Sequence, residues 1–176
     1  MTDTADGWID ALGLAVHPEG GYFRETYRAG TAVAAGALPA CFGGARPVST
    51  AIYFLLRGSQ HSALHRLRAD EVWHYYQGSS LTLHEIHPDG TAIDVRLGRL
   101  GIPGAAPQRI VPAGCWFGAT VDDPQACTLV GCTVAPGFTA QDFELGDPAA
   151  LIAQYPQHAE LIRRLAPAGR AVATPR

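Results

Sequence analysis

Imidazole, carboxylate and aromatic side chains lie close together in the stretch His65-Arg66-Leu67-Arg68-Ala69-Asp70-Glu71-Val72-Trp73-His74-Tyr75-Tyr76-Gln77-Gly78. Residues 50–56 before it are apolar, aromatic and β-branched, and residues 80–86 after it alternate between polar and apolar, so both predict β-strands. Asp70 favours a tight turn at 68–70, because an aspartate side chain readily hydrogen-bonds the backbone of a turn. The stretch therefore predicts two neighbouring antiparallel strands joined by that turn.

Side chains alternate between the two faces of a strand, so this hairpin would place residues 65, 67, 71, 73 and 75 on one face. His65 and Glu71 would be diagonal neighbours with Cα atoms about 7–8 Å apart, close enough to share a small ligand. Val72 and His74 would lie on the opposite face. We therefore expect His65, Glu71 and Trp73 to point into the interior of a small barrel.

Two motifs in the sequence resemble those of the cupin superfamily. Gly78 follows Glu71 after six intervening residues, with a histidine just upstream, as in the first cupin motif. Pro112-Ala113-Gly114 resembles the Pro-x-Gly centre of the second motif. More specifically, the chain resembles the cupin-5 family, whose functions are largely unassigned. The matching stretches are residues 17–27 (His-Pro-Glu-Gly-Gly-Tyr-Phe-Arg-Glu-Thr-Tyr), 51–56, 65–66, 70–74, 111–116 and 131–138.

The resemblance implies an all-β fold, the double-stranded β-helix or jelly roll of the cupins, with short N- and C-terminal helices. The cupin-5 family is itself similar in fold to the dTDP-sugar 3,5-epimerases. We expect a single cupin domain over residues 1–166. We expect residues 167–176 to be a disordered tail, because they have little apolar content.

The rest of the chain agrees with this fold, since many short strands broken by Gly, Pro or Asp are typical of a sandwich or barrel. Asp6 is expected to cap an N-terminal helix that ends at Gly13, and Asp147-Pro148 to begin a helix near the C-terminus. Residues 29–47 are rich in Ala and Gly and predict an exposed loop. The other predicted elements are strands at 22–28, 91–97, 108–111, 116–121 and 126–134, and a helix at 157–165.

Composition argues against several classes of partner. Charged residues are 16% of the chain and hydrophobic residues 47%, which indicates a globular protein. The net charge of −3, with 13 scattered Lys and Arg, argues against a nucleic-acid partner. No apolar run approaches the roughly 18 residues of a membrane span, so we expect no membrane partner. The polar, acidic first residues are unlike a signal peptide, so we expect a cytoplasmic protein whose cysteines are thiols.

The resemblance to metal-binding cupins is incomplete. Those proteins usually offer three histidines and one glutamate, two of the histidines coming from a His-x-His motif. Here Leu67 stands two residues after His65, and Phe117 stands where the third histidine would be. His65 and Glu71 remain, whereas stable sites usually need three or four protein donors. The pattern requires no cofactor, and a divalent metal held by His65 and Glu71 stays open.

His65 and Glu71 carry the predicted chemistry. An imidazole can take a proton near neutral pH, so we expect His65 to act as a general base that Glu71 orients, with Tyr75 or Tyr22 as proton donor. These groups would suffice to abstract a proton beside the carbonyl of a small carbohydrate-like or carbonyl substrate, as an epimerase or isomerase does. The residues expected to bind the small-molecule ligand are Tyr22, Arg24, Tyr53, Trp73, Trp116 and Phe117.

Two other functions stay open on this evidence. The same interior would also suit a non-catalytic module that binds a small ligand, or a metal-dependent cupin enzyme. The oligomeric state is predicted from residues 51–56 and 72–76, which are apolar on both faces. A sheet that is apolar on both faces is covered on both, so we expect a homodimer.

Overall fold

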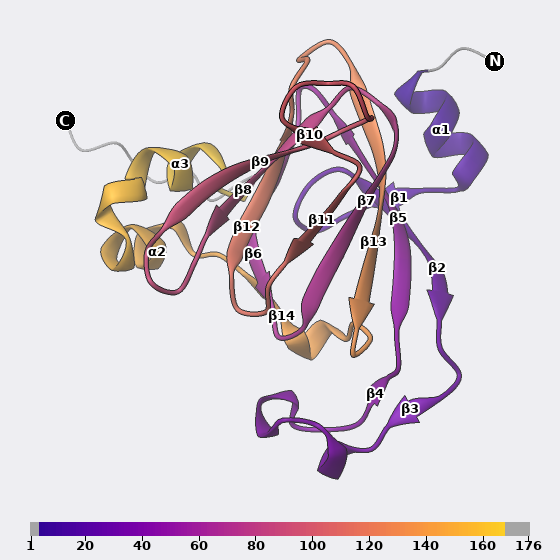
Figure 1. The fold of residues 1–176 in the computed structure, drawn as a ribbon, viewed down its shortest axis with the longest axis vertical. Helices are drawn as coiled ribbons and strands as arrows, with labels where there is room; N and C mark the ends of the chain where they lie inside the picture. The colour runs from indigo at the N-terminus through magenta and orange to yellow at the C-terminus, as the bar shows by residue number, and fades with distance from the viewer. Residues whose placement is uncertain (1–3, 168–176) are drawn as a thin grey trace.

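The structure is a computed structural model that describes residues 4–167, so residues 168–176 of the predicted tail lie outside the described part of the chain. Two mainly antiparallel six-stranded sheets pack face to face (Figure 1). The strand order is β1-β2-β5-β13-β7-β11 in the first sheet and β10-β9-β8-β12-β6-β14 in the second. The predicted all-β jelly roll is confirmed, but within residues 4–167 the sheets form an open sandwich and not a closed barrel.

The strands begin and end close to the predicted positions, because Gly, Pro and Asp interrupt the apolar runs. The strands of the first sheet are β1 (Ala15–Val16), β2 (Tyr22–Arg28), β5 (Thr50–Arg57), β13 (Cys127–Ala135), β7 (Asp70–Gly78) and β11 (Gln108–Val111). Those of the second sheet are β10 (Ala105–Ala106), β9 (Ala92–Leu97), β8 (Leu81–Ile86), β12 (Trp116–Val121), β6 (His61–Leu67) and β14 (Phe143–Leu145).

The strands β6 and β7 do not form the predicted hairpin. β6 pairs with β12 and β14 in the second sheet, whereas β7 pairs with β13 and β11 in the first. The turn after β6 therefore carries the chain across the sandwich, and His65 and Glu71 approach each other from opposite sheets. The predicted inner face is still confirmed, because His65, Glu71 and Trp73 are buried while Val72 and His74 are only half-buried.

The second cupin motif holds this crossing in place. The backbone N–H of Gly114 donates to the carbonyl of Leu67 at 2.8 Å. The backbone N–H of Ala113 donates to the side chain of Asp70 at 2.8 Å. Gly114 has a φ of 78°, a conformation that glycine adopts without strain. The Pro-x-Gly turn therefore fixes the two strand ends that carry the candidate site.

Two aromatic residues divide the interior of the sandwich. Phe117 pairs with both His65 and Glu85 across the second sheet, and Trp73 pairs with Arg109 in the first. The rings of Phe117 and Trp73 meet edge to face with centroids 6.2 Å apart. His65 therefore lies on one side of this aromatic contact, and Glu85 and Arg109 lie on the other.

Helices flank the sandwich (Figure 1). α1 (Ala5–Leu12) begins with Thr4 as its cap instead of the predicted Asp6, and it ends as predicted at Gly13. α2 (Pro148–Gln154) begins after the predicted cap, Asp147, and the 3-10 helix η4 (Pro156–His158) leads into α3 (Ala159–Arg164). Within residues 4–167 no helix has the length and apolar character that a membrane span requires.

The helices α2 and α3 bury the outer face of the second sheet. Their apolar side chains, including Leu151 and Ile162, pack with Leu64 and Trp116 into a separate cluster. Because side chains alternate along β12, Trp116 faces these helices while Phe117 faces the interior.

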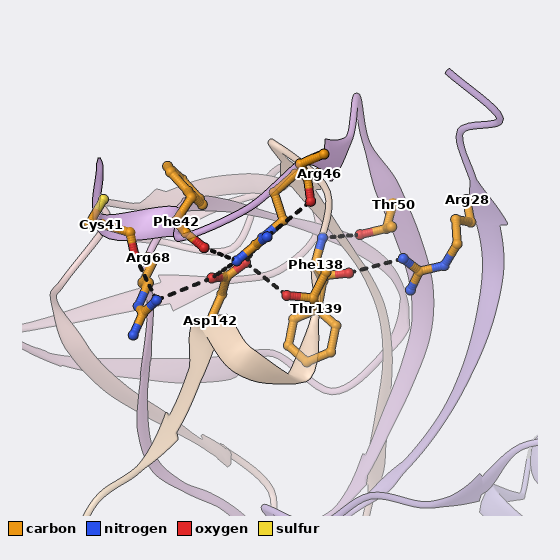
Figure 2. A network of polar contacts seen from close by, with 10 residues as sticks. Arg28, Cys41, Phe42, Arg46, Thr50, Arg68, Phe138, Thr139 and Asp142 are labelled. Carbon is orange, nitrogen blue, oxygen red and sulfur yellow. Dashed lines mark hydrogen bonds and ion pairs between the residues drawn. The ribbon is translucent and has the colours of Figure 1, made fainter. Parts of the chain in front are cut away.

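Residues 29–47 form an arm that is more ordered than the exposed loop predicted from composition. Figure 2 shows how it is joined to the sandwich: the guanidinium of Arg46 donates to both carboxylate oxygens of Asp142, at 2.5 and 2.8 Å, and to the carbonyl of Phe42. Arg46, Phe42 and Asp142 are buried. The arm contains β3 (Ala32–Val33), η1 (Ala35–Ala37), η2 (Ala40–Phe42) and β4 (Arg46–Pro47), and Asp142 ends η3 (Ala140–Asp142).

Candidate functional site

A cavity of about 110 Å³ lies between the sheets, on the His65 side of the Trp73–Phe117 contact. Ionisable side chains line its floor, and aromatic side chains line its walls. Strands of both sheets and the segment before β2 contribute to it. The lining residues are His17, Glu19, Phe23, Glu25, Arg28, Thr50, Ile52, Phe54, His65, Leu67, Glu71, Trp73, Cys132, Val134, Phe138 and Phe143.

The imidazole of His65 is held at both of its nitrogens. Nδ1 lies 2.8 Å from the carbonyl of Ala63, and because a carbonyl only accepts, Nδ1 carries a proton. Nε2 lies 3.1 Å from Oε2 of Glu19. Burial lowers the pKa of His65 and raises the pKa of Glu19, so both groups favour their neutral forms. At this separation a proton on either atom makes a hydrogen bond between His65 and Glu19.

Glu19 reaches the cavity because of the local turn at residues 17–21. The carbonyl of Glu19 accepts from the backbone N–H of Ala63 at 2.8 Å, which joins the turn to β6. The hydroxyl of Ser62 donates to Oε1 of Glu19 at 2.7 Å. Gly20 has a φ of 110° and would bring any Cβ against the carbonyl of His61, so this approach requires glycine.

Glu71 is the second buried carboxyl group of the floor. The indole N–H of Trp73 donates to Oε2 of Glu71 at 2.9 Å, and the thiol of Cys132 also donates to this carboxyl group. Burial raises the pKa of Glu71 to about 7, against a smaller opposing effect from His65. Glu71 therefore changes its protonation state near neutral pH, as a general acid or base must.

His17 completes the ionisable floor. Its Nδ1 accepts from the backbone N–H of Glu19 at 3.4 Å and lies 3.7 Å from Oε2 of the same residue. Its ring meets Phe23 and Phe54 edge to face, at centroid distances of 4.5 and 5.7 Å. Burial lowers the pKa of His17, so this imidazole also favours the neutral form.

The mouth of the cavity carries an ion pair. The guanidinium of Arg28 donates to the carboxylate of Glu25 at 2.9 and 2.5 Å. Figure 2 shows that Arg28 also donates to the carbonyl of Phe138, at 3.1 Å. The backbone N–H of Phe138 in turn donates to the hydroxyl of Thr50 at 2.9 Å. The mouth is therefore polar, whereas the walls are largely apolar.

The structure brings together only some of the predicted site residues. His65, Glu71 and Trp73 line the cavity, and Phe117 packs on the ring of His65 with centroids 4.1 Å apart. Tyr75 does not line the cavity. β7 is irregular beyond Tyr75, and the Tyr75 hydroxyl donates to the carbonyl of Gly78 at 2.6 Å instead.

Four residues predicted to bind ligand point away from the cavity. Tyr22, Arg24 and Tyr53 lie on the outer face of the first sheet, where the guanidinium of Arg24 lies over the ring of Tyr53 at 5.8 Å. Trp116 lies beneath the C-terminal helices, and Arg66 covers its ring at 4.5 Å. Alternation along β2 explains the result, because Phe23 and Glu25 take the inner positions.

Sequence reasoning missed Glu19 and His17 as site residues. Both lie in the stretch 17–27 that carries the family resemblance, beside a Gly-Gly pair that allows a close backbone approach. A glutamate next to two glycines was the available signal. The contact between Glu19 and His65 joins residues far apart in sequence, so strand alternation alone could not reveal it.

The cavity does not fit the metal-ligand set of three histidines and one glutamate. Leu67 lines the cavity at one of the ligand positions, and Phe117 occupies another. Among the described residues, the one group of three donor atoms close enough together for a metal ion lies elsewhere. It consists of Glu85, His87 and Cys115, on the other side of the Trp73–Phe117 contact.

Comparison with known proteins agrees with the fold. The Cupin-5 family model, described as "Cupin superfamily (DUF985)", matches residues 6–146. The chain therefore belongs to this family of cupins. No curated protein matches the sequence.

Two similar solved structures cover almost the whole chain. A protein from Shewanella oneidensis is 42% identical, with a TM-score of 0.83 over 93% of this chain and 97% of that chain. A hypothetical protein from Leishmania major is 38% identical, with a TM-score of 0.84 over 93% of this chain and 98% of that chain. Oxalate decarboxylase from Bacillus subtilis is 14% identical, with a TM-score of 0.53 over 89% of this chain and 37% of that chain, and shows the fold alone.

Proposed function

We propose that this cupin binds a small carbonyl compound between its sheets and moves a proton on the carbon next to the carbonyl group. The observation that carries the proposal is the 3.1 Å contact between Nε2 of His65 and Oε2 of Glu19. Because Nδ1 already donates to a backbone carbonyl, this pair holds a single mobile proton at the floor of the cavity. Glu71, with a pKa of about 7, supplies the second titrating group.

The two groups have complementary roles in this proposal. Glu71 as a carboxylate takes a proton from the carbon beside the carbonyl group, and the Glu19–His65 pair donates its proton to the carbonyl oxygen. Glu71 then returns its proton to the former carbonyl carbon, while a hydroxyl group on the neighbouring carbon loses its proton to the Glu19–His65 pair, which completes the isomerisation of a hydroxy-carbonyl compound. Trp73 and Phe117 keep the floor dry, which strengthens the interactions of the developing charge.

The size of the cavity limits the ligand. An apolar cavity of about 150 Å³ accommodates benzene in another protein, and this cavity measures about 110 Å³. The enclosed part therefore suits a ligand of roughly half a dozen non-hydrogen atoms. A nucleotide-linked sugar does not fit inside it, so we favour a small aldehyde, ketone or 2-oxo acid as the substrate.

Solvent-deuterium exchange tests the proposal. Dihydroxyacetone and pyruvate serve as first probes, and NMR measures deuterium incorporation at the carbon beside the carbonyl group. We expect exchange with the wild-type protein and a loss of about 10²–10⁴-fold in Glu71→Gln, with probe binding nearly unchanged. Glu144→Gln, which changes an exposed carboxylate on β14, is the matched control and should exchange at the wild-type rate.

Two results would favour other functions. Saturable binding of small carbonyl compounds without any exchange would support the non-catalytic binding module. If the Glu71→Gln variant still exchanges deuterium, Glu71 is not the base that takes the proton from carbon.

A metal-dependent cupin is the second candidate. The Nε2–Oε2 separation of 3.1 Å between His65 and Glu19 is compatible with two ligands of one ion, and Glu71 lies in the same cavity. Bacillus subtilis oxalate decarboxylase, which shares the fold, has Mn(II) centres. Stoichiometric metal in untagged protein, lost in Glu19→Gln and His65→Ala, would support this candidate.

A further inference from the structure

A second cluster of donor atoms lies in the interior, away from the cavity. Glu85 of β8 is fully buried and pairs with Phe117, whose ring separates it from His65. His87 follows β8, and Cys115 precedes β12. The proposed function uses none of the three donors.

The donor atoms of this cluster have the spacing of metal ligands. One ligand atom from each of Glu85, His87 and Cys115 lies within 4.8 Å of the other two. Nε2 of His87 lies 3.4 Å from Oε2 of Glu85. Zinc bound to nitrogen and oxygen at about 2.1 Å in a tetrahedron separates those ligands by about 3.4 Å. Two of the three donors therefore already have tetrahedral spacing.

Arg109 supplies the positive charge beside this cluster in the structure. Its guanidinium donates to both carboxylate oxygens of Glu85, at 2.7 and 2.8 Å, from the edge strand β11. A buried carboxylate requires such a partner, because an unpaired charge in the interior is costly. The side chain of Arg109 is 29% exposed and that of Glu85 is fully buried. Arg109 therefore reaches solvent, whereas Glu85 does not.

We propose that Glu85, His87 and Cys115 form a site for a zinc-class divalent ion, and that Arg109 neutralises Glu85 when the ion is absent. Sulfur, nitrogen and oxygen donors together suit zinc, whereas magnesium and calcium prefer oxygen alone. The thiol of Cys115 releases its proton to solvent as sulfur binds the metal. Three protein ligands leave a fourth position for water at the solvent-accessible side of His87.

Zinc titration of chelator-treated, untagged protein tests this site. We expect the wild type to bind one equivalent and to melt at a higher temperature when zinc is present, because an ion that binds only the folded chain stabilises it. Cys115→Ser and His87→Ala should each weaken binding by at least about 30-fold, corresponding to about 2 kcal/mol. Cys41→Ser is the matched control. Cys41 is exposed on the arm, so this variant should bind zinc as the wild type does.

Cobalt(II) substitution reports the sulfur ligand directly. The wild type should show thiolate-to-cobalt charge-transfer absorption, which His65→Ala retains and Cys115→Ser lacks. This spectrum of the wild type tests the site even where Cys115→Ser fails to fold. Three outcomes would overturn the proposal: no saturable zinc binding, zinc binding that both ligand variants retain, and zinc binding that is lost in His65→Ala but kept in Cys115→Ser.

Discussion

The ring of His65 cannot rotate without losing an interaction at one of its nitrogens. Nδ1 donates to Ala63, and Nε2 faces Glu19 at 3.1 Å. The orientation of the ring therefore depends on Ala63 and Glu19, and not on Glu71 as the predicted hairpin would require. The charges of His65 and Glu19 still influence the titration of Glu71, and that titration can be tested at the scale of one residue.

Glu71→Gln should change how stability depends on pH. Burial raises the pKa of Glu71 from 4.5 to about 7, so the folded chain holds this proton more tightly than the unfolded chain. The protonated carboxyl group of Glu71 contributes fully to the free energy of unfolding below pH 4.5, and this contribution is lost as pH rises through about 7. Glutamine keeps the shape without titrating, so the variant should gain up to about 3 kcal/mol on the wild type over this pH range.

Urea denaturation at about pH 4.5 and about pH 8 checks this prediction. The comparison uses the difference between variant and wild type, because Glu19, His17 and His65 also titrate in the folded chain. Glu144→Gln should show the same pH dependence as the wild type. Equal stability differences between Glu71→Gln and the wild type at both pH values would contradict the raised pKa.

Strand alternation predicted part of the site correctly from local sequence. His65, Glu71 and Trp73 face the interior because each follows the period of its own strand, whichever sheet that strand joins. Tyr75 also packs against the core cluster that contains Trp73, but it does not line the cavity, because it lies farther along β7. Glu19 was missed because its place beside His65 depends on a contact between distant segments.

The turn at residues 17–21 is the element that assembles the cavity floor. It places Glu19 against His65 and His17 against the aromatic wall, and it is closed by a hydrogen bond from the N–H of His17 to the carbonyl of Gly21 at 3.0 Å. The sequence predicted this turn from its Pro and Gly residues. It did not reveal that the turn packs on β6, because the contacts of Glu19 with Ser62, Ala63 and His65 join segments far apart in sequence.

Gly20→Ala should disrupt this turn. Gly20 has a φ of 110°, and a Cβ there would collide with the backbone of His61. A residue forced into such a conformation costs about 1–3 kcal/mol before the collision is counted. We expect the free energy of unfolding to fall by at least that amount. Gly36→Ala is the control, because a Cβ at Gly36 meets no atom within 4 Å; equal stability of the two variants would contradict this role of the turn.

Asp142→Ala should detach the arm from the sandwich. It leaves the buried guanidinium of Arg46 without its carboxylate, and removal of one partner of a buried ion pair typically costs about 3–5 kcal/mol. Glu144→Ala removes an exposed ion pair with Arg66 from the adjacent strand and should cost at most about 1 kcal/mol. Urea denaturation of both variants makes the comparison, and equal losses would show that the Arg46–Asp142 pair does not hold the arm.

At the scale of the whole molecule, the number of strands and their approximate ends follow from the sequence, whereas their distribution between two sheets does not. A turn such as 68–70 can close a hairpin or carry the chain between sheets, and the choice depends on partners far along the chain. At 68–70 the chain passes between the sheets, because the backbone N–H groups of residues 113 and 114 hydrogen-bond Asp70 and Leu67. This choice lets residues from both sheets line one cavity.

The outer face of the first sheet leads to the last prediction, that the protein forms a homodimer in solution. The ring of Tyr76 lies over Gly131 on this face and meets Tyr53 edge to face with centroids 6.0 Å apart. Tyr76 and Ile110 are 51% and 52% exposed although both are large and apolar. α1 reaches this face beside Arg57, which pairs with Asp6, but within residues 4–167 no helix covers it around Tyr76 and Ile110 as α2 and α3 cover the second sheet, so we expect a second copy to cover that part. A specific interface would bury about 1,600 Å² in total.

Sedimentation at micromolar concentration measures the oligomeric state directly. We expect the wild type to sediment as a dimer and Tyr76→Arg and Ile110→Asp to sediment as monomers, because a charge at the centre of an interface loses its water without gaining a partner. Leu100→Asp is the control: Leu100 is 79% exposed but lies in the loop after β9, so this variant should remain dimeric. A monomeric wild type would contradict the dimer itself. A dimer that persists in both Tyr76→Arg and Ile110→Asp would place the interface on another face.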